Sequence, residues 1–483
     1  MTDHLQKTLR LHARQSRPSA VILASAVSLA LSACVVGPAY APPAATAVAT
    51  WHAPLPHEGS VATLNAWWSS WNDPALTALI AATQASNATL EQAAARIAQA
   101  RASQAIAGPA ALPGVSGSAS ASSGNSGNGM GVVSSIGASL QAAWELDLFG
   151  ANRRTREAAD ARFAARSIDW HQARVSLAAE VAVAYVNLRI NEALLTGYER
   201  DALSRTQTAR LTGLKTDAGF ETPANAALAR ASASEAAARL TAQRTEVDLG
   251  IKALVALTGM PETTLRSLLA ARRAQLPKGA TPGVNRVPAA VLSQRPDVAA
   301  AERELAALAA EVGAAEADRY PRISLTGSVA YSLSRMAGMT TDGVTWGFGP
   351  SLTIPLFDAG RRSAAVDLAR ARYDESLAGY KVIATRAVRE VEEALTRLQS
   401  ATLRAPDLQA SFAGYQAFEK AAQARLSAGA GSVLELEDAR RTVLTARVAV
   451  LAVERERLSA AISLYRAVGG GWDQTQKQVS EKN

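Results

Sequence analysis

The sequence predicts a mainly α protein with membrane β-structure: long antiparallel helices forming a coiled-coil barrel, plus four amphipathic strands per chain. Three observations support this fold class. The 483-residue chain is rich in alanine and has only 5% aromatic residues, a composition that favours closely packed helices. Segments about 208 to 210 positions apart match each other in order along nearly the whole chain. Four short segments alternate between apolar and polar residues.

The first 33 residues predict a secretory signal peptide. Lys7, Arg10, Arg14 and Arg17 precede an apolar run from Ala20 to Ala33, which is the order found in signal peptides. The run is shorter than the roughly 20 residues that span a bilayer comfortably. An uncleaved membrane anchor remains the alternative.

The only cysteine of the chain follows this segment directly. Leu31, Ser32 and Ala33 precede Cys34, and this order resembles the bacterial lipobox, whose cysteine is lipidated and becomes the first mature residue. A lone thiol in an exported protein has no partner for an internal disulfide, so lipidation accounts for its position. Val35 follows Cys34. In bacterial lipoproteins generally, the absence of an aspartate at this position favours the outer membrane. A chance cysteine is the other interpretation.

The charge of the mature chain gives little support to a nucleic-acid partner. The formal net charge is +8, and the first 33 residues contribute +3 of it, which leaves +5. The remaining basic residues alternate with acids along helical stretches, a pattern typical of solvated helix faces. We therefore expect no nucleic-acid partner.

An internal tandem repeat organises the chain. Leu-Phe-Gly at 148–150 recurs as Leu-Phe-Asp at 356–358, and Ala-Gly at 218–219 recurs at 428–429. The predicted regions are a signal peptide (1–33), an N-terminal lipidated segment (34–73), a first repeat (74–260) with a hairpin (113–149) and a turn (215–222), a linker (261–296), a second repeat (297–468) with a hairpin (321–357) and a turn (426–432), and a tail (469–483).

Each repeat predicts two long helices joined by a turn. No proline lies between Gly150 and Thr222, which permits one helix of about 60 residues, followed by another of about 35. In the second repeat Pro406 interrupts the long helix, where we expect a kink or a break into two stacked helices. Helices of this length imply coiled-coil packing.

The alternating segments predict one β-hairpin per repeat. They are 115–121, 140–148, 323–331 and 344–356, each with an apolar face and a small or polar face. Hairpin loops are expected at 122–131 and 334–343.

These strands need partners from other chains if they lie in a membrane. The pattern alone would favour a soluble sheet with one face on a core, but the expected lipid anchor favours the membrane. Four strands cannot close a membrane barrel, because bacterial barrels start at eight strands and lipid does not tolerate open edges. Three chains would give the strands of a 12-stranded β-barrel with a lumen.

Several motifs together resemble the TolC family of outer-membrane efflux factors, specifically its lipidated branch. The resemblance covers essentially all of the mature chain. The matching residues are Cys34, Gly37, Pro38, Tyr40, Trp144, Glu145, Asp147, Leu148, Phe149, Gly150, Arg295, Pro296, Asp297, Val298, Ala301, Glu302, Pro321, Leu325, Gly327, Ser328, Pro355, Leu356, Phe357, Gly360 and Arg361.

The resemblance implies a passive, lipid-anchored homotrimer in the cell outer membrane with a long periplasmic tunnel. It implies an equatorial domain built from the termini and the mid-chain linker. It implies that small molecules, such as drugs or toxic compounds, arrive from an inner-membrane pump of the RND type through a periplasmic adaptor protein. No cofactor or metal is implied.

The resemblance also assigns roles to residues near the two turns. Gly219 and Gly429 resemble the glycines that contact the adaptor. Glu435 and Asp438 align with acidic positions that line the constricted aperture, where three chains would place six carboxylates that favour cations. An ordinary exposed acidic helix face is the alternative. The chain has Leu426 and Gly431 where the best-known relatives carry a tyrosine and an arginine that hold the tip closed.

Catalysis finds little support in the sequence. Only His52, His57 and His171 follow the signal segment, and none has metal-ligand spacing. Gly469 to Gly471 lack the lysine and the following helix of a phosphate-binding loop and predict a helix stop. The chain is therefore not expected to be an enzyme. Two alternatives remain: a conduit for type I protein secretion and a periplasmic coiled-coil scaffold without a pore.

Overall fold

The computed structural model describes residues 40–43, 67–125, 132–279, 292, 294–336 and 338–472. The chain divides into two compact units. The strand unit comprises Met1–Pro42, Gln99–Ala164 and Arg303–Ala378, and the helical unit comprises Pro43–Ala98, Ala165–Glu302 and Gly379–Asn483. The predicted signal peptide and Cys34 lie outside the described residues.

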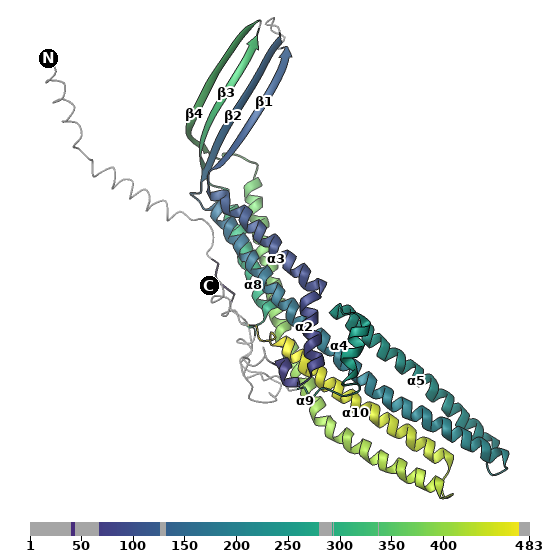
Figure 1. The fold of residues 1–483 in the computed structure, drawn as a ribbon. Helices are drawn as coiled ribbons and strands as arrows, with labels where there is room; N and C mark the ends of the chain where they lie inside the picture. The colour runs from purple at the N-terminus through teal and green to yellow at the C-terminus, as the bar shows by residue number, and fades with distance from the viewer. Residues whose placement is uncertain are drawn as a thin grey trace, which may run out of the picture. The chain divides into compact units, whose positions relative to one another are not determined.

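The strand unit contains one antiparallel sheet of four long strands (Figure 1). The strands are β1 (Gly114–Asn125), β2 (Val132–Leu146), β3 (Arg322–Met336) and β4 (Met339–Thr353), and they lie in the order β1-β2-β3-β4. The hairpin expected in each repeat is confirmed. The two hairpins meet at β2 and β3, so the first repeat contacts the second in the middle of the sheet.

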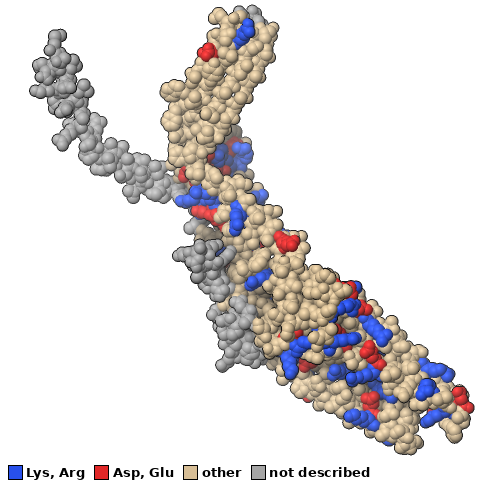
Figure 2. Space-filling view, viewed as in Figure 1, with Lys and Arg blue, Asp and Glu red and all other residues tan. Residues whose placement is uncertain are grey.

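The register of this sheet sorts the side chains onto two different faces. One cross-strand row runs through Gly117, Leu140, Val329 and Trp346, and the next rows on this face are similarly apolar or small. Rows on the other face carry hydroxyl groups, glycine and few charges, such as the row of Ser118, Ser139, Ala330 and Thr345. Figure 2 shows few charged side chains on the strands and many on the helices of the helical unit.

The hairpin loops are shorter than the sequence predicted. Strand β1 extends to Asn125, β3 extends to Met336, and β4 begins at Met339, directly after Gly338 with a φ of 84°. The loop expected at 334–343 is therefore wrong, because its polar residues lie within strands that have a hydroxyl-bearing face. Leu148, Ile354 and Leu356 lie beyond the strand ends.

The helices reproduce the predicted pairs of about 60 and 35 residues. The α-helices of the described residues are α2 (Pro74–Ser86), α3 (Ala88–Ala107), α4 (Ala151–Asp217), α5 (Pro223–Thr258), α6 (Glu262–Ala270), α8 (Pro296–Ala317), α9 (Arg361–Ser427) and α10 (Val433–Ala467). Helices α4 and α9 have 67 residues each, and α5 and α10 have 36 and 35. None of the helices in the described part of the chain has the length and apolar composition that crossing a membrane requires.

Helix α9 continues through Pro406 as one helix. The predicted break into two stacked helices is wrong. Proline removes only one backbone donor, which is a small part of the hydrogen bonding of a helix of 67 residues.

The helices of the strand unit pack through small side chains. Ala158 of α4 is buried against Ala307 and Ala310 of α8. Around this contact Arg162 of α4 makes an ion pair of 2.7 Å with Glu311 of α8. Alanine permits the close approach of the two helices, and the ion pair lies at its edge.

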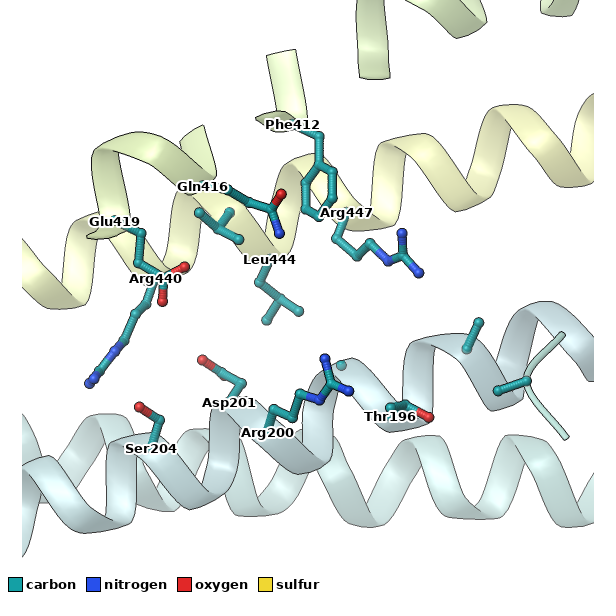
Figure 3. A pocket seen from close by; sticks show the side chains of 14 residues that line it. Thr196, Arg200, Asp201, Ser204, Phe412, Gln416, Glu419, Arg440, Leu444 and Arg447 are labelled. Carbon is teal, nitrogen blue, oxygen red and sulfur yellow. The ribbon is translucent and has the colours of Figure 1, made fainter. Parts of the chain in front are cut away.

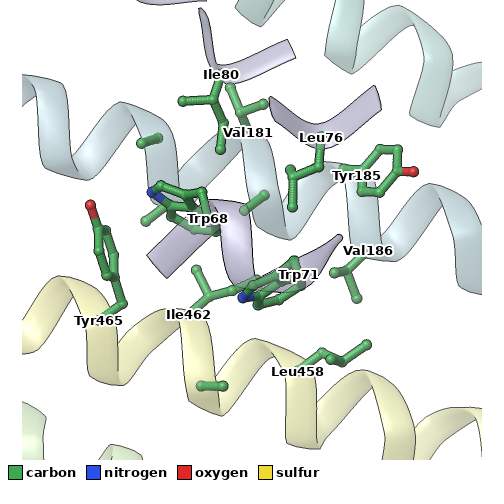
Figure 4. Packing of buried hydrophobic residues seen from close by; sticks show 14 of the residues in the cluster. Trp68, Trp71, Leu76, Ile80, Val181, Tyr185, Val186, Leu458, Ile462 and Tyr465 are labelled. Carbon is green, nitrogen blue, oxygen red and sulfur yellow. The ribbon is translucent and has the colours of Figure 1, made fainter. Parts of the chain in front are cut away.

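The main core of the helical unit joins the segment before α2 to helices of both repeats (Figure 4). Trp67, Trp68 and Trp71 are buried there, and Trp67 stacks on Tyr465 of α10 with ring centroids 4.8 Å apart. On the α4 side, the Tyr185 hydroxyl donates to Asp73 at 2.8 Å. This core fixes the two long helices that lead to the turns.

A buried ion pair attaches the linker to the same core. Arg189 of α4 contacts Glu192 at 2.7 Å and donates to the carbonyl of Leu269 at 3.0 Å. Glu192 in turn accepts from the backbone N–H of Ala274. The linker 261–296 thus contains helix α6 and is tied to α4 by a paired, hydrogen-bonded charge.

The glycines after α10 end the helix and allow a close contact. Gly469, Gly470 and Gly471 have positive φ values of 90°, 60° and 79°, and a Cβ atom on Gly469 would lie 2.3 Å from the carbonyl oxygen of Gln294. Next to this contact Arg295 donates to the carbonyl of Ala467 at 2.9 Å. The predicted helix stop is confirmed, and it also joins the end of α10 to the start of α8.

Candidate functional site

The first tip turn joins α4 to α5 and consists of 215–222. Gly219 has a φ of 78°, and its backbone N–H donates to Thr216 while that of Phe220 donates to Lys215, at 3.0 and 2.8 Å. This pair of bonds is the Schellman ending of a helix, which needs a left-handed residue. Thr222 then caps α5 by accepting from the N–H of Asn225.

The second tip turn joins α9 to α10 and consists of 426–432, with the same geometry. Gly429 has a φ of 76°, and Gly429 and Ala430 donate to Leu426 and Arg425 at 3.1 and 2.9 Å. Ser432 caps α10 by accepting from the N–H of Glu435 at 3.1 Å. The backbone of the turn is therefore duplicated along with the sequence.

The side chains of the two turns differ. Phe220 is 83% exposed at the first tip turn, next to a groove of about 450 Å³ lined mainly by apolar side chains of α4, α9 and α10. The second tip turn has Ala430 and Gly431 where the first has Phe220 and Glu221. A Cβ atom on Gly431 would lie 3.0 Å from the backbone nitrogen of Leu426, so a larger residue there would crowd the turn.

Glu435 and Asp438 lie three residues apart on α10, where Glu435 is half-buried and Asp438 is exposed. Glu435 makes an ion pair of 2.7 Å with Arg425, and Asp438 makes one of 2.6 Å with Arg441. Each carboxylate therefore has a cationic partner within its own chain. Their predicted assembly into a ring involves other chains and stays a prediction.

A buried ion network above the tip turns was not predicted from the sequence. Arg205 of α4 and Glu437 of α10 are each 7% exposed and lie 2.7 Å apart. Asp201 accepts from Arg205 Nε at 2.9 and 3.0 Å, and Ser232 of α5 donates to Glu437 at 2.7 Å. The network joins the helical hairpin α4–α5 to the helical hairpin α9–α10.

Arg440 extends this network. It donates to Glu437 at 3.1 Å, to Thr208 of α4 at 2.6 Å and to Gln423 of α9 at 3.0 Å. The two carboxylates and two guanidinium groups balance in charge, so the buried pair has the hydrogen bonds that such a pair needs. We name the contact of α4 with α10 at Arg205, Thr208, Glu437 and Arg440 the ionic seam. Only the pairs on one helix, Asp201 with Arg205 and Glu437 with Arg440, have a spacing that the sequence shows.

A cleft of about 550 Å³ adjoins the ionic seam. Figure 3 shows Arg200 of α4 and Arg447 of α10 pointing into it from opposite sides. Arg447 lies over the ring of Phe412 of α9, 5.5 Å from its centroid. No group of three or more His, Cys, Asp or Glu side chains within the described ranges could hold a metal ion. The arrangement is a set of helix contacts around a groove.

Comparison with known proteins identifies the architecture. The profile of the family described as "Outer membrane efflux protein" matches residues 79–260 and 287–470, close to the two repeats. The outer membrane protein OprJ of Pseudomonas aeruginosa is 31% identical over 477 residues, which cover 96% of this chain and 98% of OprJ. The probable efflux pump outer membrane protein TtgC of Pseudomonas putida is 28% identical, with 95% of this chain and 98% of TtgC covered.

A solved structure gives the same result. The structure of the outer-membrane channel OprN is 30% identical and superposes with a TM-score of 0.81, covering 91% of this chain and 100% of OprN. The resemblance to TolC-like efflux factors is thereby confirmed. The chain belongs to the outer membrane efflux protein family, and it is an outer-membrane efflux channel.

Proposed function

We propose that this chain is the passive outer-membrane conduit of a three-part efflux system, and that it works as a homotrimer which carries out no chemistry of its own. The observation that carries this proposal is the two-faced sheet. Its apolar rows suit lipid, and its hydroxyl rows suit a water-filled lumen. Four strands leave two open edges, which lipid does not tolerate, and three chains would close them as a 12-stranded barrel.

The lumen face of this barrel would discriminate little between solutes. Its rows consist of serine, threonine, glycine and alanine over most of their length, with Ser118 and Ser139 hydrogen-bonded at 2.8 Å. Small neutral side chains exert no strong field on a passing ion. Selection therefore belongs to the pump and to the tip.

The tips would receive the periplasmic adaptor. Gly219 and Gly429 give both turns a compact form, and the apolar groove beside Phe220 offers surface for a partner helix. We assign the energy source to an inner-membrane pump of the RND type. Cys34 would carry the lipid anchor, and mass spectrometry of the mature N-terminus tests this: an unmodified Cys34, or a retained signal segment, contradicts it.

Glu435 and Asp438 would form the acidic ring of the aperture. What supports the ring is their position in the first two turns of α10, where Asp438 is exposed and Glu435 is partly exposed. Their pairing with Arg425 and Arg441 lowers the net charge of the ring, so we expect a moderate preference for cations.

Single-channel recording in planar bilayers tests both the conduit and the ring. Purified lipidated trimers should give discrete current steps, and the reversal potential in a salt gradient should show cation preference. Glu435→Gln with Asp438→Asn should reduce that preference. Asp217→Asn, which removes an exposed acid at the first tip turn, is the matched control and should leave it unchanged.

Three other outcomes are informative. Steps whose selectivity ignores the double substitution keep the conduit and remove the ring. Folded trimers that insert and never conduct, even after the tip turns are destabilised, favour the pore-free scaffold. Passage of an unfolded polypeptide, with no flux of small molecules, would favour the type I secretion conduit.

A further inference from the structure

The cleft beside the ionic seam contains two arginines that the helix contacts do not use. Its volume of about 550 Å³ lies in the range of sites that bind small organic molecules. Arg200 of α4 and Arg447 of α10 point into it from opposite sides (Figure 3). All lining residues belong to the helical unit of one chain, so a single chain is enough to form this cleft.

The two arginines lie at nearly the same level of the cleft. The contacts of the ionic seam set the register of the antiparallel helices α4 and α10. Extended to Arg200, this register reaches positions 442–448 of α10, a stretch that contains Arg447. At a rise of 1.5 Å per residue, Arg200 and Arg447 are therefore within about 8 Å of each other along the helix axes. Two long side chains can bridge such a difference and reach the same small ligand.

Most other charged groups of the cleft already have partners. Asp201 accepts from Arg205 at 2.9 Å, and Arg440 is paired with Glu437 at 3.1 Å. The two arginines that point into the cleft make no ion pair with any residue that the structure describes. Their charges are thus available to a ligand.

Glu419 of α9 is the remaining acid among the lining residues. Figure 3 shows it at the end of the cleft where Arg440 lies, away from Arg447. The uncompensated charges are therefore two guanidinium groups and one carboxylate. Facing guanidinium groups repel each other, and an anion between them removes this repulsion. The cleft favours an anionic ligand for this reason.

Apolar side chains form the wall next to the two arginines. Leu444 of α10 points into the cleft toward α4 (Figure 3), and Val443 also lines it. Phe412 of α9 lies under the guanidinium of Arg447, 5.5 Å from the ring centroid to the central carbon. This contact restricts the rotamers of Arg447, so less conformational entropy is lost when a ligand binds.

We propose that this cleft binds a small organic carboxylate. The guanidinium groups of Arg200 and Arg447 donate to its carboxylate from opposite sides in charge-assisted hydrogen bonds. Its apolar body lies against Leu444. The inference goes beyond the proposed function, because a passive conduit needs no ligand of its own.

A bound carboxylate also connects the two halves of the helical unit. It contacts α4 on one side and α10 on the other, and these helices belong to the helical hairpins α4–α5 and α9–α10. The ligand therefore adds a second tie between the hairpins, beside the ionic seam. A ligand that binds only the folded state raises its stability in proportion to the logarithm of ligand concentration.

Equilibrium dialysis of radiolabelled benzoate against the purified, lipidated protein tests the site. The native chain should bind benzoate saturably. Arg200→Gln and Arg447→Gln should each raise the Kd by about tenfold or more, since each removes a charge-assisted hydrogen bond. Arg210→Gln is the matched control, because it removes an exposed arginine of α4 that does not line the cleft, and it should leave the Kd unchanged. Partition of benzoate into detergent is the same for every variant and does not saturate.

Competition and thermal unfolding examine the two parts of the ligand. Acetate should compete with benzoate at least about tenfold more weakly, because it lacks the apolar body that Leu444 contacts. Benzoate should raise the unfolding temperature of the native chain and leave that of Arg447→Gln unchanged. Unfolding temperatures without ligand show whether each variant is folded. Inorganic phosphate that competes as well as benzoate itself would overturn the organic ligand.

The binding results do not depend on conductance. The site is overturned if native protein shows no saturable binding, if Arg200→Gln and Arg447→Gln bind benzoate as the native chain does, or if Arg210→Gln weakens binding equally. None of these results changes the current steps expected in planar bilayers, so the cleft and the proposed conduit can fail separately.

Discussion

The two tip turns share one backbone and differ in their side chains. Gly219 and Gly429 have φ values of 78° and 76°, and the hydrogen bonds around them match one for one. The first turn places Phe220 and Glu221 where the second has Ala430 and Gly431. The turn geometry is therefore a requirement of the fold, whereas the side chains of each turn depend on what surrounds that turn.

The same divergence continues into the helices above the turns. Glu437 of α10 is buried in the ionic seam, and the matching position on α5 is Ala227. The position of Arg205 on α4 corresponds to the exposed Tyr415 on α9. Polar residues appear where the repeats meet inside the chain, and aromatic residues appear on the copy of that surface.

Breaking the ionic seam should cause the largest loss in the free energy of unfolding. Glu437→Ala leaves Arg205 buried without its interhelical partner, so the free energy of unfolding should fall by about 3–5 kcal/mol. Asp438→Ala, one residue on, removes an exposed carboxylate and should change it by less than about 1 kcal/mol. Denaturant unfolding of the detergent-solubilised protein measures both. Equal losses would mean that the buried network stabilises the protein no more than an exposed ion pair does.

The second-largest effect should come from adding a methyl group in the tip turns, because the second turn is more crowded than the first. Gly431→Ala places a methyl group against the backbone of Leu426 and should destabilise the protein by about 1–3 kcal/mol. The matched change in the first turn, Glu221→Ala, meets no such contact and should stay within about 0.5 kcal/mol. Thermal unfolding compares the two. A tolerated Gly431→Ala would remove the steric explanation for the glycine.

Substitution of the two glycines with positive φ should destabilise the protein by similar amounts. Gly219→Ala and Gly429→Ala force a side chain into a positive φ, which costs about 1 kcal/mol at each turn. A new Cβ would meet no atom within 4 Å at either site, so the loss of stability reports only the cost of the positive φ. Asparagine at the same positions should lose less, because it adopts this conformation more readily. A response at only one turn would contradict the shared backbone.

The smallest expected effect is a pH dependence confined to the first turn. Hydrogen bonds from the Asn225 side chain and from the backbone N–H of Thr222 lower the pKa of Glu221. A carboxylate with a lowered folded-state pKa stabilises the protein above its unfolded pKa and loses that contribution as the pH falls through the lowered value. The difference in unfolding free energy between the native chain and Glu221→Gln should therefore shrink on acidification. A constant difference would show that those hydrogen bonds do not favour the ionised form.

Much of the fold followed from local signals in the sequence. Gly219 and Gly429, which recur with the repeat, marked both turns because glycine fits a tight turn between antiparallel helices. Alternation located the strands, but Ser334 to Gly343 looked like a loop because one face of those strands bears hydroxyl groups. Arg205 and Glu437 lie 232 positions apart, and no local pattern joins them. The burial of Trp67, Trp68 and Trp71 likewise depends on tertiary contacts with α4 and α10.

The most direct test of the channel is efflux in cells. In a host stripped of its own outer membrane efflux proteins and carrying the matching pump and adaptor, a panel of dyes and antibiotics is followed inside the cells with and without this chain. We expect at least one compound to accumulate less when the native chain is present. Equal accumulation of every compound, with correctly folded trimers in the outer membrane, would show that the chain is not an efflux channel.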